Sequence, residues 1–126
     1  ANPDPLWSRG LGDVYKRQPL MAPAAEKMGE VLNHTNLNQP VVPIISNVTA
    51  APETQPNEIR KLLVNQVTSK VRSRESIEII RDLGVHTFIE VGMGKVLTGM
   101  VKRIDKNLSA MSIQSPKDIE NFLSSI

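Results

Sequence analysis

A chain of 126 residues with a hydrophobic content of 40% is long enough to bury a core as one domain, but with only 3% aromatic residues that core must be aliphatic. Fifteen basic and thirteen acidic residues leave a formal charge of +2, which argues against the basic surface of a nucleic-acid-binding protein. Because the chain has no cysteine and no apolar run near the roughly 20 residues of a membrane-spanning helix, we expect a cytoplasmic protein that does not bind membranes.

The first predicted element is a helix over residues 22–32, where apolar residues recur at helical spacing and Pro23 stands in the first turn. The β-branched run over 41–48 predicts a strand buried on both faces. We expect its pairing over 44–48, because Pro43 cannot donate to a ladder. A second helix should begin near Thr54 or Asn57 and end near Val67.

The second half of the chain continues the alternation of helices and strands. A helix should begin at Ser73 and stop at Gly84, since glycine commonly follows a helix end. Strands are predicted over 87–91 and 108–113, with a helix over 96–104 between them. Ser115 and Pro116 should cap and open a last helix. This order predicts an α/β fold with a mostly parallel sheet.

The segment Gly-Met-Gly-Lys at 92–95 stands between a predicted strand and a predicted helix, where a phosphate-binding loop could lie. A Walker loop needs four residues between the glycines and Ser or Thr after the lysine, and a dinucleotide fingerprint needs a third glycine. The segment meets neither requirement. We interpret it as a tight turn into the helix, with Lys95 in solvent.

The remaining polar residues predict no self-contained active site. His34 and His86 lie far apart and cysteine is absent, so we expect no metal site. The sequence also lacks a Gly-x-Ser-x-Gly nucleophile motif. Acidic pairs such as Glu75 and Glu78 stand beside basic residues, and we interpret them as solvated helix faces.

Four sequence blocks nevertheless occur in the order and at the spacing of one enzyme family. They are Pro-Leu-Met-Ala-Pro-Ala-Ala-Glu-Lys-Met at 19–28, Val-Pro-Ile-Ile-Ser-Asn-Val-Thr-Ala at 42–50, Leu-Val-Asn-Gln-Val-Thr-Ser at 63–69 and Phe-Ile-Glu-Val-Gly-Met-Gly-Lys-Val-Leu-Thr-Gly-Met-Val-Lys-Arg-Ile at 88–104. With these blocks the chain resembles malonyl-CoA:acyl carrier protein transacylase, of which it corresponds only to the C-terminal third. The resemblance implies the C-terminal part of a hydrolase-like, parallel-sheet acyltransferase fold, with the ferredoxin-like insert largely missing.

The resemblance also implies a reaction. The family transfers malonyl from malonyl-CoA to the phosphopantetheine thiol of acyl carrier protein, in fatty acid biosynthesis, through a serine that a histidine activates. It implies a monomeric parent enzyme with these two substrates, acyl carrier protein as partner, and no separate cofactor or metal. The serine and the arginine that holds the malonyl carboxylate precede the part of the family that this chain resembles. We therefore expect the chain alone to be inactive.

Two site residues carry over to this chain through the resemblance. Gln66 matches the glutamine whose main-chain carbonyl orients the catalytic histidine, and Asn47 matches an asparagine at the substrate-binding wall. The histidine itself is missing, because aligning 19–21 with the family's His-Ser-Pro-Leu-Met motif places Arg17 at the histidine and Gln18 at the serine. An arginine stays protonated and cannot act as a general base.

The stretch Ser-Arg-Gly-Leu-Gly-Asp-Val-Tyr-Lys-Arg-Gln at 8–18 ends where the resemblance begins, and it resembles a translated sequencing adapter. We interpret 1–18 as an artefactual leader and 19–126 as the C-terminal portion of a malonyltransferase domain. Two alternatives stay open. One is a non-catalytic binding module on the acyltransferase scaffold, which would contact acyl carrier protein through residues such as Lys102 and Arg103. The other is a fragment of a synthase acyltransferase that uses another acyl extender.

Overall fold

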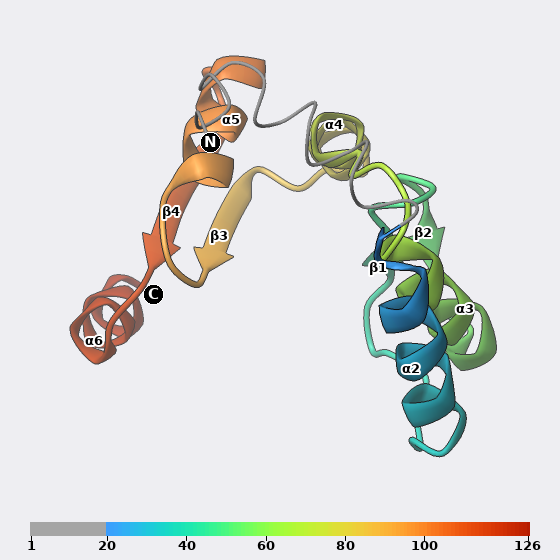
Figure 1. The fold of residues 1–126 in the computed structure, drawn as a ribbon. Helices are drawn as coiled ribbons and strands as arrows, with labels where there is room; N and C mark the ends of the chain where they lie inside the picture. The colour runs from blue at the N-terminus through green and yellow to red at the C-terminus, as the bar shows by residue number, and fades with distance from the viewer. Residues whose placement is uncertain (1–19) are drawn as a thin grey trace, which may run out of the picture. The chain divides into compact units, whose positions relative to one another are not determined.

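The computed structural model describes residues 20–126, which divide into two compact units with the boundary between Arg72 and Ser73 (Figure 1). The first unit holds the described residues up to Arg72, and the second holds 73–126. Residues 1–18, interpreted above as a leader, lie outside the described residues. In the part of the chain that the structure covers, no helix is both long enough and apolar enough to cross a membrane.

The first unit is built around two helices, α2 (Ala22–Asn33) and α3 (Pro56–Gln66), each with a proline in its first turn. Such a proline fixes a helical φ. Its lack of an N–H costs nothing there, because the N–H groups of the first turn have no intrahelical acceptor. The two helices lie close together at Gly29 of α2 and Val64 near the end of α3, because a Cβ built on Gly29 would stand 3.8 Å from a methyl of Val64. A side chain larger than hydrogen at position 29 would therefore meet α3.

The C-terminal end of α2 is held by Arg60, which projects from α3. Its Nε donates to the carbonyl oxygen of Leu32 at 2.7 Å, and its Nη2 donates to that of Thr35 at 2.9 Å. The last carbonyls of a helix have no intrahelical partner and carry partial negative charge. A guanidinium donates hydrogen bonds to these carbonyls and also brings a positive charge to them, so the start of α3 is fixed against the end of α2.

A short antiparallel hairpin completes the first unit, with β1 (Ile44–Ile45) paired to β2 (Pro52–Glu53). The sequence predicted a strand over 41–48 that is buried on both faces, and this prediction is wrong. Only Ile44 and Ile45 pair, and Val41 is fully exposed. Two prolines that lack an N–H, at 40 and 43, keep the preceding residues out of a ladder.

The predicted strand also ends early because the chain turns at 46–50. The Ser46 hydroxyl accepts from the Val48 N–H at 3.1 Å, and the Ala50 N–H donates to the Ser46 carbonyl at 2.8 Å. Ala50 adopts φ 51°, in the left-handed region that L-residues rarely occupy. These local bonds take the donors and acceptors that a continuing strand would need, and they direct the chain back into β2.

The second unit is a β-α-β arrangement flanked by two further helices. Its elements in chain order are α4 (Ser73–Asp82), β3 (Thr87–Val91), α5 (Val96–Ile104), β4 (Ser109–Ile113) and α6 (Pro116–Ser125). Strands β3 and β4 pair in parallel from Thr87 with Ser109 to Val91 with Ile113. The buried core consists of Ile77, Val101 and Leu108, with Phe88, Met100, Ile104 and Ala110 packed against it.

The predicted α/β fold class is confirmed, and the elements of the second unit lie within one or two residues of their predicted bounds. Gly84 follows α4 at φ 96°, as expected of a residue that ends a helix. The Ser115 hydroxyl accepts from the Asp118 N–H at 3.2 Å, as expected of a helix cap. The sheet was predicted to be mostly parallel, whereas the described strands form one parallel pair and one antiparallel pair.

Candidate functional site

Gln66 is the last residue of α3 and is half-buried. The carbonyls just before it are satisfied, since Val64 accepts from the Val67 N–H at 3.2 Å and Asn65 accepts from the Thr68 N–H at 3.3 Å. Among residues 20–126 no donor is bonded to the main-chain oxygen of Gln66. This oxygen stands at the negative end of the helix and can accept a hydrogen bond from an additional group such as an imidazole N–H.

Gln66 lines two hollows of the first unit. The larger is a shallow apolar depression of about 400 Å³, lined by Met21, Met28, Leu32, Leu63, Gln66 and Val67. The smaller, of about 50 Å³, lies between α3 and the hairpin and is lined in part by Ser46. Gln66 thus stands where the start of α2, the end of α3 and β1 come together.

Asn47 lies next to Ser46 in the turn after β1 and is half-buried. Its carbonyl accepts from the Arg72 N–H at 3.0 Å, and the Arg72 guanidinium donates to the Thr49 carbonyl at 3.3 Å. The turn is therefore held from outside as well as by its own bonds. Ser46 shares the smaller hollow with Gln66, whereas Asn47 is not part of its lining. The roles of Gln66 and Asn47 stay predictions, and Arg17 lies outside the described residues.

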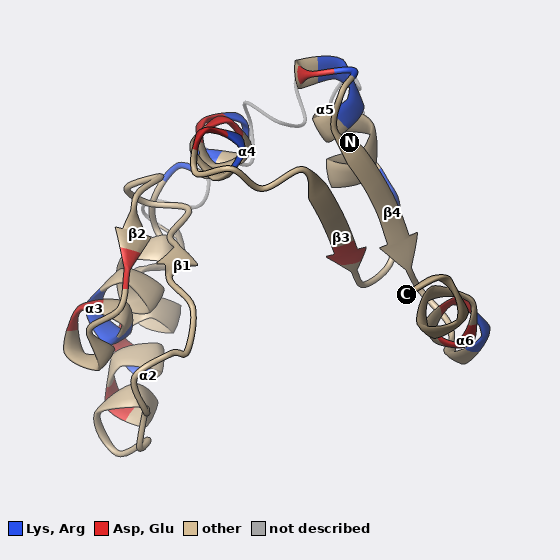
Figure 2. Cartoon of the chain, turned by 180° about the vertical axis from the view of Figure 1, so that it is seen from behind, with Lys and Arg blue, Asp and Glu red and all other residues tan. Residues whose placement is uncertain are grey.

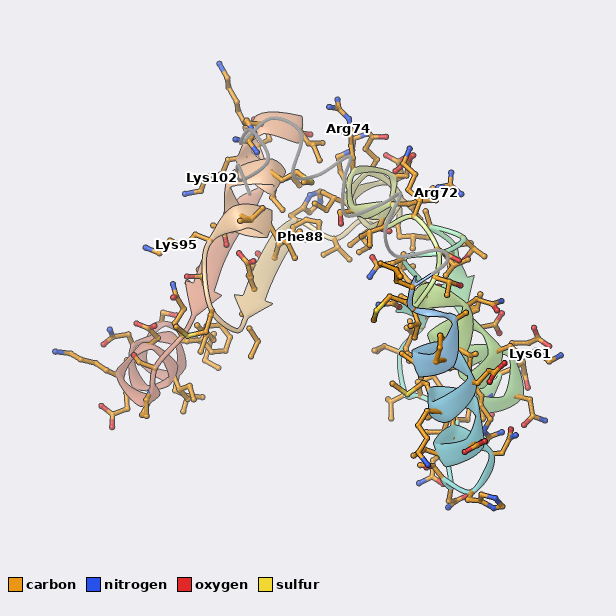
Figure 3. All side chains as sticks on the ribbon, viewed as in Figure 1. Lys61, Arg72, Arg74, Phe88, Lys95 and Lys102 are labelled. Atoms are coloured by element: carbon orange, nitrogen blue, oxygen red, sulfur yellow. The ribbon has the colours of Figure 1, made fainter. Side chains whose placement is uncertain are left out.

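The glycine turn of the second unit is a strand-to-helix connection, as interpreted from the sequence. Gly92 at φ 137° and Gly94 at φ 93° occupy backbone conformations that favour glycine. Lys95 is exposed, and its side chain points away from the ribbon (Figure 3). The interpretation of this segment as a turn with Lys95 in solvent is confirmed.

The start of α5 is capped by Glu90 of β3, a role that the sequence analysis did not predict. The Glu90 carboxylate accepts from the Thr98 N–H at 3.0 Å, the Thr98 hydroxyl at 2.8 Å and the Leu97 N–H at 3.3 Å. These bonds, chiefly the one from the Thr98 N–H, lower the pKa of Glu90. The amides that a phosphate would use are bound to a protein carboxylate, so this turn is not a phosphate site.

The start of α6 is capped by the Ser115 hydroxyl, and Asp118 in its first turn binds the loop before the helix. The Asp118 carboxylate accepts from the Gln114 N–H at 2.9 Å, and this bond is the main cause that lowers the pKa of Asp118. The Gln114 side chain in turn accepts from the Gly94 N–H at 3.2 Å and so ties the two loops together. Both helix starts at the carboxyl edge of the β3–β4 sheet are therefore capped by the chain itself.

The opposite end of α5 is basic. Lys102 and Arg103 are exposed in its last turn, and basic residues colour that end of the helix blue in Figure 2. The Lys102 side chain points away from the ribbon (Figure 3). The described residues contain no cluster of three or more histidine or acidic side chains that could hold a metal ion.

No protein-family model matches the chain. Curated proteins of one kind do match it in sequence. The malonyl CoA-acyl carrier protein transacylase of Bacillus subtilis (strain 168) is 45% identical over 101 residues, which are 80% of this chain and 32% of the relative. The transacylase of Haemophilus influenzae is 41% identical over 107 residues, covering 82% and 34%. The chain thus spans about a third of the length of the curated relatives it matches.

Solved structures agree with these sequence matches. An acyl-carrier-protein-S-malonyltransferase from Bartonella henselae superposes with a TM-score of 0.77 at 45% identity, covering 86% of this chain and 35% of that one. A malonyl-transacylase in complex with its type II PKS acyl-carrier protein superposes with a TM-score of 0.76 at 35% identity, covering 87% and 36%. The similarity therefore extends from sequence to fold.

Proposed function

We propose that this chain, whose resemblance to the malonyl-CoA:acyl carrier protein transacylases is confirmed by these matches, is the C-terminal part of such an enzyme. The parent would transfer malonyl from malonyl-CoA to the phosphopantetheine thiol of acyl carrier protein. The observation that carries the proposal is the 45% identity over 80% of the chain. The position of Gln66 supports it.

The Gln66 carbonyl would act on a histidine at position 17 of the parent. Met21 and Gln66 line the same depression, and position 17 precedes Met21 by four residues, a span of at most about 14 Å in extended chain. This span permits a histidine there to contact the open carbonyl at the end of α3. By accepting the imidazole Nδ1–H, the carbonyl would fix the tautomer whose Nε2 takes a proton.

The reaction would proceed in two transfers. The histidine takes the proton of the serine hydroxyl while the serine oxygen attacks the malonyl thioester, and the coenzyme A thiol leaves with that proton. The phosphopantetheine thiol then gives its proton to the histidine and attacks the serine ester, and the serine oxygen leaves with that proton, which restores the hydroxyl and the neutral histidine. With Arg17 in the histidine position the first proton transfer fails, so this chain alone should show no malonyl transfer above background.

The genomic DNA upstream of codon 19 tests this proposal most simply. We expect it to encode histidine and serine in place of Arg17 and Gln18, preceded by a nucleophilic serine motif, and the open reading frame should express an active malonyltransferase. If the genome instead encodes Arg17 and Gln18 and no serine motif precedes them, the proposal is wrong.

Acyl carrier protein would be the partner, and the basic end of α5 is where we place its approach. Lys102 and Arg103 offer exposed positive charge, and the phosphopantetheine arm carries a negatively charged phosphate. A matched malonyl-transacylase was solved in complex with its type II PKS acyl-carrier protein. Four points stay predictions: the reaction needs no separate cofactor, the parent is a monomer, it lies in the cytoplasm, and it transfers malonyl rather than another extender.

A further inference from the structure

The turn over 46–50 belongs to the most deeply buried part of the first unit. Ser46 and Ala50, at its two ends, are 7% and 6% exposed, and Ile59 of α3 is 8% exposed. Among the described residues of this unit no other residue is as well covered. Since the turn is also closed by its own hydrogen bonds, it is a fixed part of the unit against which other segments can be held.

The end of α3 is held less firmly by its own bonds. Its last two hydrogen bonds, to the carbonyls of Val64 and Asn65, are 3.2 and 3.3 Å long, which is the long end of the range for an N–H···O bond. The Gln66 carbonyl belongs to the peptide that joins Gln66 to Val67. The direction of this carbonyl therefore depends on where the chain after 66 is held.

Arg72 holds this part of the chain. Among the described residues, its N–H makes the first main-chain hydrogen bond after Thr68 that returns to the first unit, to the Asn47 carbonyl at 3.0 Å. Its guanidinium donates to the Thr49 carbonyl at 3.3 Å. The segment that leaves Gln66 is thus anchored, six residues later, on the buried turn.

The turn and the end of α3 also face each other directly. Ser46 and Gln66 line the same hollow of about 50 Å³, together with the buried Ile59. A shift of the turn would therefore change the surroundings of Gln66. Arg72 can act on Gln66 by two routes, along the chain through 67–72 and across the hollow through the turn.

We propose that Arg72 is a positioning residue for malonyl transfer, which fixes the direction of the Gln66 main-chain carbonyl. This inference rests on the proposed function, in which that carbonyl accepts the Nδ1–H of a histidine at position 17 of the parent. Arg72 would act through Gln66 and not on the reacting atoms. A well-aligned carbonyl stabilises the protonated imidazole more than the neutral one, because a hydrogen bond from a charged donor is stronger. A misaligned carbonyl should therefore lower the pKa of the histidine and slow the proton transfer.

Substitutions in the full-length enzyme encoded by the genomic reading frame test this role. Arg72→Met removes the guanidinium bond to Thr49 and should lower kcat at least about threefold. It should also move the acidic limb of the kcat/KM pH profile to lower pH, because the histidine then loses its proton more readily. Arg72→Lys keeps a charged donor and should recover most of the rate.

Arg60→Met is the matched control. It makes the same side-chain change in the same unit and removes two guanidinium bonds, to the carbonyls of Leu32 and Thr35. It should leave kcat and the pH profile unchanged. Amide exchange of the 126-residue chain measures the hold itself, and exchange at 48–50 should speed up in Arg72→Met but not in Arg60→Met.

The outcomes separate this inference from the proposed function. An unchanged acidic limb in Arg72→Met, equal kinetic losses in Arg72→Met and Arg60→Met, or unchanged exchange at 48–50 would each overturn the inference while the proposed function stands. If Arg72→Met does not fold, Arg72→Lys should show a smaller shift of the limb in the same direction, and no shift would overturn the inference. An unsubstituted full-length enzyme that transfers no malonyl would overturn the proposed function, and the inference with it.

Discussion

The stability of the second unit should depend on Leu108, which is only 5% exposed and packs with Ile77 and Val101. Leu108→Ala removes three carbon atoms from this contact, worth about 2.4 kcal/mol at about 0.8 kcal/mol per buried carbon. The cavity left behind raises the expected loss to about 3–5 kcal/mol. A core of three buried side chains supplies little more than this, so most second-unit molecules should be unfolded in the variant.

Amide hydrogen exchange of the intact chain measures this loss. Protection of β3 and β4 should fall at least about a hundredfold, the equivalent of about 3 kcal/mol. Amides of α2 and α3 should keep their protection, because they belong to the other unit. Leu123→Ala is the matched control, since Leu123 is 58% exposed and its truncation removes little buried surface. Equal exchange in Leu108→Ala and Leu123→Ala would show that Leu108 does not support the second-unit core.

Three further substitutions test local contacts. The pKa of Glu90 is lowered below its ordinary 4.5 in the folded chain, so its contribution to stability is present above pH 4.5 and lost as the pH falls through the lowered pKa. Glu90→Gln should therefore reduce the acid sensitivity of second-unit unfolding followed by circular dichroism, and an unchanged pH profile would contradict this. Ala50→Gly should change the melting temperature of the first unit little, because relief of about 1 kcal/mol of left-handed strain offsets the loss of a buried methyl worth about 0.8 kcal/mol, whereas a fall of many degrees would show that Ala50 is not strained. Arg60→Met should cost about 1 kcal/mol and speed amide exchange at 33–35, and unchanged exchange there would show that the guanidinium does not hold α2.

The elements of the second unit could be predicted from sequence because their signals are local. Gly84 ends α4, and Ser115 with Pro116 opens α6 through contacts within a few residues. The short apolar run over 87–91 likewise predicted β3 with its observed bounds. Where the determinants lie inside the element or at its ends, composition and spacing were sufficient.

The hairpin β1–β2 could not be predicted in this way. The apolar run over 41–48 has the composition of a buried strand, but its second half forms a turn that depends on the Ser46 hydroxyl and on Ala50 in a left-handed conformation. Alanine is not a residue that signals such a conformation. The bond from Arg72 to Asn47 joins residues far apart in sequence, and no local pattern announces it.

The candidate site was only partly accessible to sequence reasoning. Gln66 and Asn47 were predicted from family resemblance alone. The proposed role of Gln66 belongs to its main-chain oxygen, which every residue type has, so no sequence pattern could identify it. What the structure adds is that Gln66 ends α3 beside Met21. The Glu90 cap escaped notice, although an acidic residue on the core-facing side of a strand, two residues before a glycine turn, is a signal that could be searched for.

Malonyl transfer by a fusion protein tests the proposed function most directly. The portion of the Bacillus subtilis transacylase that precedes its matched third would be joined to residues 19–126, once with His-Ser and once with Arg-Gln at positions 17 and 18. We expect transfer to acyl carrier protein by the His-Ser form at least about a hundredfold faster than by the Arg-Gln form, because only histidine can exchange the proton. Equal rates in two folded fusions would contradict the proposed function.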